Sequence, residues 1–139
     1  MPTEQPLKDC RVLVVDDDDP AREVLRALLE AAGAVVSTAP SGAAAWSEID
    51  RSRPEVMIVD LGMPIVDGFT FVEQLRLRPA ASGGLVPVAA LTGYVSSEDR
   101  ARAARAGFQA YLVKPVEPAD LLDTVARLAR LPQSGSSAG

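Results

Sequence analysis

The chain has 139 residues, 47% of them hydrophobic, and a net charge of −5 at neutral pH, a length that suits one well-buried domain. The acidic balance argues against non-specific binding to nucleic acid, and the absence of histidine excludes a Ser-His-Asp triad, a histidine-ligated zinc ion and a phosphohistidine on this chain. No apolar stretch approaches the roughly 18 residues of a membrane span, residues 1–9 lack the apolar core of a signal peptide, and the single cysteine cannot form an internal disulfide, so we expect a cytoplasmic protein.

The first predicted elements are a strand and a helix. Residues 12–15 form an apolar run, predicted as a buried strand, which ends at Asp16 and Asp17. A helix is expected over 20–32, because it begins with a proline in the tolerated first turn and carries one apolar face. Its cap is expected to be Asp19 or a neighbour of Asp19.

The next segment repeats this alternation. A short strand is predicted over 34–38 and a second helix over 41–51. Residues 56–59 form a very apolar run, predicted as a strand, which ends at Asp60. The following residues, 61–68, contain proline and an Asp-Gly pair and therefore predict a loop.

A third helix is expected around residues 69–75, where apolar residues recur at helical spacing. Residues 79–84 are small and predict a loop. The apolar run 88–91 predicts a strand that ends at Thr92.

The last third of the chain predicts two more helices and one strand. A helix is expected over 96–106, a strand over 109–113 and a final helix around 121–128. The strand ends at Lys114, and the proline that follows breaks the chain there. Residues 132–139, rich in serine and glycine, are expected to be a disordered tail.

Strands that alternate with helices predict a parallel sheet covered on both faces. The carboxyl ends of parallel strands meet at one rim, so we expect Asp16, Asp17, Asp60, Thr92 and Lys114 to lie close together. Crowded carboxylates repel one another, and a site that keeps them ionised usually holds a hard divalent cation such as Mg²⁺. The lysine and the threonine are then left for an anion, which points to phosphoryl chemistry.

The order and spacing of these residues resemble the response regulator receiver domain of two-component signalling. The resemblance covers roughly residues 10–130 and rests on an acidic pair after the first strand, an acid after the third, a hydroxyl after the fourth and a lysine-proline pair after the fifth. It implies an α/β, flavodoxin-like (βα)5 three-layer sandwich with strand order 2-1-3-4-5. We expect the receiver domain to span 10–131, after an N-terminal extension over 1–9.

The resemblance also implies the chemical roles at the rim. Asp60 would receive a phosphoryl group from the phosphohistidine of a histidine kinase or a histidine phosphotransfer protein. Mg²⁺ would be held by Asp16, Asp17, Asp60 and the backbone carbonyl of Gly62. Lys114 would pair with the phosphoryl oxygens. The only chemistry expected is self-phosphorylation and slow autodephosphorylation, so the chain would be a signalling phosphoprotein and not an enzyme.

The same resemblance implies a switch that acts on a downstream effector protein. Thr92 would bond a phosphoryl oxygen after phosphorylation, and the ring of Tyr111 would move from exposed toward buried. The peptide between Lys114 and Pro115 is expected to be cis. The helix expected over 96–106 offers mostly alanine to the core, which predicts weak anchoring; the alanines concerned are Ala101, Ala103, Ala104 and Ala106.

Two other interpretations remain open at this point. Asp16 and Asp18 after the first strand mimic the nucleophile motif of phosphatases of the haloacid dehalogenase type, in which Asp16 would be the residue that is phosphorylated. The expected proline and helix after Lys114, and the short chain, argue against that alternative. The third interpretation is a scaffold that binds partners without phosphorylation, and it predicts equal binding when Asp60 is replaced by Asn.

Overall fold

The computed structural model of the chain describes residues 5–63, 67–93 and 96–131, so the tail expected over 132–139 lies outside the described residues. Five strands form one parallel sheet in the order β2-β1-β3-β4-β5. The strands are β1 (Arg11–Val15), β2 (Val35–Ala39), β3 (Val56–Asp60), β4 (Val88–Thr92) and β5 (Ala110–Val113). This order and the alternation with helices confirm the predicted fold.

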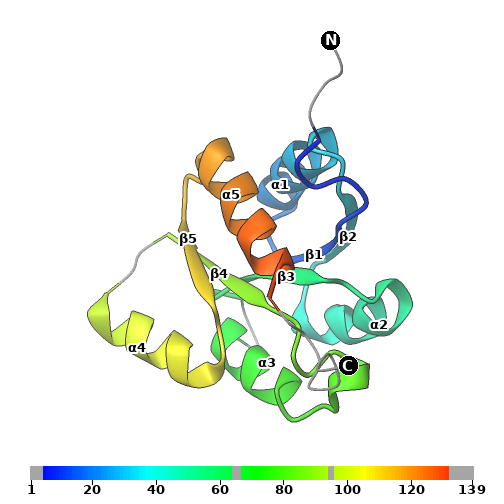
Figure 1. Cartoon of the computed structure of the whole chain (residues 1–139). Helices are drawn as coiled ribbons and strands as arrows, with labels where there is room; N and C mark the ends of the chain where they lie inside the picture. Colours follow the sequence, from blue (N-terminus) through cyan, green and yellow to red (C-terminus); the bar gives the residue numbers. More distant parts are fainter. Residues whose placement is uncertain (1–4, 64–66, 94–95, 132–139) are drawn as a thin grey trace.

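Helices cover both faces of the sheet (Figure 1). The helices are α1 (Asp19–Ala31), α2 (Gly42–Ser52), α3 (Gly68–Leu75), α4 (Ser97–Ala106) and α5 (Pro118–Ala129), and a short 3₁₀ helix, η1 (Ala80–Ser82), lies in the loop predicted before β4. α1 and α5 lie on one face, and α2, α3 and α4 lie on the other. Among the described residues, no helix combines the length and the apolar character needed to cross a membrane.

β1, β3 and β4 are almost entirely apolar because both of their faces are covered, whereas β2, at the edge of the sheet, is mostly half-buried and carries Ser37 and Thr38. In β1, Val12 and Val14 contact the layer of α1 and α5, whereas Leu13 and Val15 contact the layer of α2, α3 and α4. Successive side chains of a strand point to opposite faces, so a strand buried on both sides needs a continuous apolar run. This requirement explains why the strands were visible in the sequence.

Side-chain caps fix the beginnings of α1, α2, α3 and α4. Asp18, the neighbour of Asp19, caps α1 by accepting the amide N–H of Ala21 at 2.9 Å. Ser41 caps α2 in the same way, and Asp67 caps α3. Each cap satisfies an amide that the helix itself leaves without a partner.

One segment differs from the expectation. Of the four alanines expected to face the core from α4, only Ala103 and Ala106 are buried, so the prediction for Ala101 and Ala104 was wrong. Both lie on the exposed face because the helical period places only every third or fourth residue against the sheet. In the segment expected as an extension, Leu7 is 2% exposed and packs in the core beside α1 and α5.

Candidate functional site

The ends of four strands bring the predicted residues to one rim of the sheet. Asp60 is the last residue of β3 and Thr92 the last of β4, while Asp16 and Lys114 directly follow β1 and β5. The backbone amide of Lys114 donates to the carbonyl of Thr92 at 2.8 Å, which continues the pairing of β4 with β5. The rim is therefore fixed by the sheet itself.

Three carboxylates gather at this rim. Asp16, Asp17 and Asp60 each offer an oxygen, and the three oxygens lie within 4.8 Å of one another. Asp16 is fully buried and Asp60 is 6% exposed, whereas Asp17 is exposed. Two of the acids thus form the floor of the site, and Asp17 forms its open side.

The electrostatics of Asp16 indicate that the cluster could hold a cation. Burial, and then the charge of Asp60, raise the pKa of Asp16, although the amide of Asp18 and the ammonium of Lys114 act in the opposite direction. Its Oδ2 atom is buried and has no hydrogen-bond partner among the described residues. An all-oxygen set of carboxylates with such an atom fits a hard divalent ion.

Lys114 is the cation that the structure places in the site. Its Nζ atom lies 3.5 Å from Oδ2 of Asp60 and 3.6 Å from Oδ2 of Asp16. The peptide between Lys114 and Pro115 is cis, as the resemblance implied. One ammonium therefore faces two carboxylates and offsets at most half of their combined charge.

The loop after β3 folds back over Asp60. The amide of Gly62 donates to Oδ1 of Asp60 at 2.9 Å, while the role of the Gly62 carbonyl as a metal ligand stays a prediction. A Cβ atom on Gly68 would lie 2.5 Å from the backbone oxygen of Asp60, so only glycine fits at this approach. The sequence suggested only a turn at Gly68, because the close contact depends on how the loop folds back.

The four consecutive aspartates have different surroundings. Oδ1 of Asp16 accepts the amide of Asp18 at 3.0 Å, Asp18 caps α1, and the carboxylate of Asp19 contacts the guanidinium of Arg22. Asp17 is left to face the opening of the site. The ion pair between Asp19 and Arg22 was not expected, because the sequence does not indicate which of the four acids the Arg22 guanidinium contacts.

Thr92 and Tyr111 connect the site to α4. Thr92 is half-buried at the end of β4, and a Cβ atom on the adjacent Gly93 would meet no atom within 4 Å. Tyr111 is half-buried, and its hydroxyl donates to the backbone carbonyl of Arg100 in α4. The Arg100 guanidinium lies 5.3 Å from the centre of the Tyr111 ring. Tyr111 thus links β5, the strand that pairs with β4, to α4.

Comparison with known proteins agrees with this geometry. Residues 12–126 match the response regulator receiver domain family. A 14.6 kDa uncharacterised protein of Leptolyngbya boryana is 42% identical over 87% of this chain and 91% of its own length. The transcriptional regulatory protein PrrA of Mycobacterium leprae is 40% identical over 86% of this chain, which spans only 50% of that protein.

A solved structure has the same fold. The receiver domain of the sensor histidine kinase PA1611 from Pseudomonas aeruginosa, which was determined with a magnesium ion in its active site cleft, superposes with a TM-score of 0.77. It is 28% identical, and the match covers 87% of this chain and 98% of that domain. The strand order, the residues gathered at the rim and the match over residues 12–126 lead to one conclusion: the chain belongs to the response regulator receiver domain family.

Proposed function

We propose that this receiver domain takes a phosphoryl group from the phosphohistidine of a partner onto Asp60, with Mg²⁺ bound by Asp16, Asp17 and Asp60. The observation that carries the proposal is the position of Asp60. Its carboxylate lies within 4.8 Å of both other acids and 3.5 Å from the Lys114 ammonium. A nucleophile, a cation site and a fixed positive charge thus meet at one point.

The transfer needs little beyond position and charge. An oxygen of the Asp60 carboxylate attacks phosphorus, the bond between phosphorus and the imidazole nitrogen breaks, and the bonding electrons leave with the donor's imidazole. Lys114 offsets the repulsion between the carboxylate and the incoming phosphoryl oxygens. Mg²⁺ would supply further neutralisation of the charge on the phosphoryl oxygens.

The donor is proposed to be a histidine kinase or a histidine phosphotransfer protein. The chain has no histidine of its own, so a phosphohistidine must come from another protein or domain. A related receiver domain is part of a sensor histidine kinase. An apolar groove of about 250 Å³ beside Lys114, lined by Val24, Leu28, Pro115 and Val116, suits an apolar helix of that donor.

Phosphorylation is proposed to switch binding to a downstream effector. The phosphoryl group adds about −1.5 to −2 charges and strong acceptor oxygens, which favour an inward position of the Thr92 hydroxyl. Tyr111 would then move further inward and change its contact with Arg100 of α4. NMR shifts of the Tyr111 ring in a phosphomimetic complex test this step, and unchanged shifts would count against it.

The test of the phosphoacceptor is intact mass after incubation with Mg²⁺ and a small phosphodonor. The wild-type chain is expected to gain one phosphoryl group, and Asp60→Asn is expected to gain none. A second sample with a chelator instead of Mg²⁺ is expected to react far more slowly. An adduct that survives the Asp60→Asn substitution would remove Asp60 from this role.

The burial of Asp16 disfavours the phosphatase alternative. The Asp16 side chain is fully buried, whereas that of Asp60 is 9% exposed. In-line attack on phosphorus needs an accessible oxygen, which Asp60 offers more readily. The scaffold interpretation predicts that Asp60→Asn binds the effector equally well under phosphorylating conditions, so a pull-down with both proteins separates it from the switch.

A further inference from the structure

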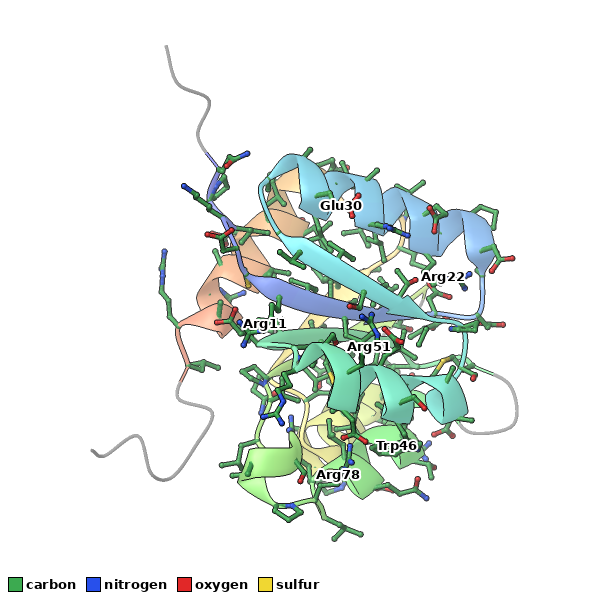
Figure 2. The ribbon with its side chains drawn as sticks, turned by 90° about the vertical axis from the view of Figure 1, so that its right-hand side faces the viewer. Arg11, Arg22, Glu30, Trp46, Arg51 and Arg78 are labelled. Atoms are coloured by element: carbon green, nitrogen blue, oxygen red, sulfur yellow. The ribbon has the colours of Figure 1, made fainter. Side chains whose placement is uncertain are left out.

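Arg22 in the first turns of α1 has contacts that membership of the family leaves unexplained. Its side chain is 13% exposed, so the guanidinium is largely enclosed. Nη1 donates to the backbone carbonyl of Asp16 at 2.7 Å, and Nη2 contacts the carboxylate of Asp19. In Figure 2, Arg22 lies at the end of α1 that meets the carboxyl ends of the strands.

The contacted carbonyl has a direct geometric link to the acidic site. It belongs to the peptide group that joins Asp16 to Asp17, so its direction sets where Asp17 places its carboxylate. The amide of Asp16 is already bonded to Ala39 at 3.1 Å, and the amide of Asp18 to Oδ1 of Asp16 at 3.0 Å. The bond from Arg22 fixes the peptide between these two anchored points.

We propose that Arg22 is a positioning residue for the cation site. It holds the peptide between Asp16 and Asp17 so that the Asp17 carboxylate faces Asp60, and it touches neither the cation nor the phosphoryl group. Asp19 holds the second arm of the guanidinium and keeps the fork in this orientation. This inference rests on the proposed function, because it takes these three carboxylates as the ligands of Mg²⁺.

The sign of the effect separates positioning from a simple charge effect. A positive charge beside a cation site repels the cation, so removal of Arg22 would tighten Mg²⁺ binding if only its charge mattered. Removal of a group that orients a ligand weakens binding, typically by about 10-fold to 100-fold. The two explanations therefore predict opposite changes in the same dissociation constant.

A second arginine of α1 provides a matched control. Arg26 pairs with Glu30 one helical turn later, with 3.3 Å between Nε and Oε2, and its side chain is 43% exposed. Figure 2 places Glu30 further along α1 from Arg22. Replacement of Arg26 by Met removes the same charge and an ion pair from the same helix, but leaves the contacts of Asp16 intact.

The experiment is calorimetric titration of Mg²⁺ into the full chain without a phosphodonor. We expect Arg22→Met to bind Mg²⁺ about tenfold more weakly than wild type, and Arg26→Met to stay within about twofold. Arg22→Lys keeps the charge but lacks the planar fork, so it is also expected to bind more weakly than wild type. Thermal unfolding with a chelator shows whether each variant is folded. If Arg22→Met is not folded, Arg22→Lys is used for the Mg²⁺ titration instead.

Each other outcome overturns the proposal. Unchanged or tighter binding by Arg22→Met, or wild-type binding by Arg22→Lys, would assign Arg22 a charge effect or a purely structural role. Wild-type protein that binds no Mg²⁺ would overturn the metal part of the proposed function as well. If only the Arg22 proposal is wrong, wild-type protein is still expected to be phosphorylated in a reaction that depends on Asp60 and Mg²⁺.

Discussion

The helices on the two sides of the acidic site are held in different ways. Both helices begin at a side-chain cap, Asp18 in α1 and Ser96 in α4, but α1 buries Leu25 and Leu29. α4 buries only Ala103 and Ala106. A buried leucine contributes about 1.5–3 kcal/mol and a methyl group about 0.8 kcal/mol, so α4 is anchored much more weakly by apolar contacts.

Polar and ring contacts make up part of the difference for α4. The guanidinium of Arg102 lies 4.1 Å from the centre of the Phe69 ring and 3.8 Å from a carboxylate oxygen of Asp67. Both partners belong to the beginning of α3, directly after the loop that follows Asp60. Such polar and ring contacts can be broken and replaced by others, so α4 suits the side of the site that could move. The buried leucines of α1 suit the side that stays fixed.

The largest expected effect breaks the apolar anchoring of α1. Leu29→Ala is expected to lower the free energy of unfolding by about 2–5 kcal/mol, because Leu29 is fully buried. Ala103→Gly in α4 removes one buried methyl group and helix propensity, and is expected to cost about 1–2 kcal/mol. Denaturant unfolding of both variants makes the comparison, and equal losses would contradict the difference between the helices.

Arg76 offers the next test. It directly follows α3, and its guanidinium contacts Gly107 at the carboxyl end of α4. Its guanidinium donates to the backbone carbonyls of Gly84, Val86 and Gly107, and thereby joins the ends of α3 and α4 to the start of β4. Arg76→Met leaves these carbonyls without a charged donor, so we expect a loss of about 2–3 kcal/mol in denaturant unfolding. Arg26→Met is the control, and a similar loss in it would remove the special role of Arg76.

Whether a part of the site could be predicted from the sequence depends on the kind of contact that forms it. Asp60, Thr92 and Lys114 were placed correctly because buried parallel strands are apolar runs whose ends can be read directly. The bond from Arg22 to a backbone carbonyl could not be predicted, because it depends on a rotamer and on the shape of one turn. The Arg76 network could not be predicted either, since it joins segments 31 residues apart.

A smaller effect concerns the charge of Asp16, on the α1 side of the site. Because burial raises the pKa of Asp16, its carboxyl binds protons more tightly in the folded state than in the unfolded state. Without Mg²⁺, the stability contributed by protonated Asp16 is present at low pH and is lost as the pH rises through the raised pKa. Asp16→Asn is therefore expected to be more stable than wild type at neutral pH without Mg²⁺.

Mg²⁺ is expected to reverse this order. Wild type gains stability in proportion to the logarithm of the ratio of free Mg²⁺ to its dissociation constant, and Asp16→Asn gains much less. Thermal unfolding of both proteins with Mg²⁺ and with a chelator measures the change. A melting temperature of wild type that ignores Mg²⁺ would contradict the cation site.

The smallest expected effect loosens α4. Arg102→Met removes the contacts with the Phe69 ring and with Asp67. Because the Arg102 side chain is 48% exposed, the expected loss is about 0.5–1 kcal/mol. Hydrogen exchange of α4 amides is expected to accelerate while that of α1 amides stays unchanged. Equal acceleration in both helices would show that Arg102 stabilises the whole domain and not α4 in particular.

The most direct test of the central claim is to find which residue carries the phosphoryl group. Wild-type protein is phosphorylated with Mg²⁺ and a small phosphodonor, the acyl phosphate is reduced to the alcohol with borohydride, and the modified residue is located by peptide mass spectrometry. The modification is predicted at Asp60, whose side chain is 9% exposed beside the Lys114 ammonium, whereas the side chain of Asp16 is fully buried. Modification at Asp16 would contradict the account and restore the phosphatase interpretation.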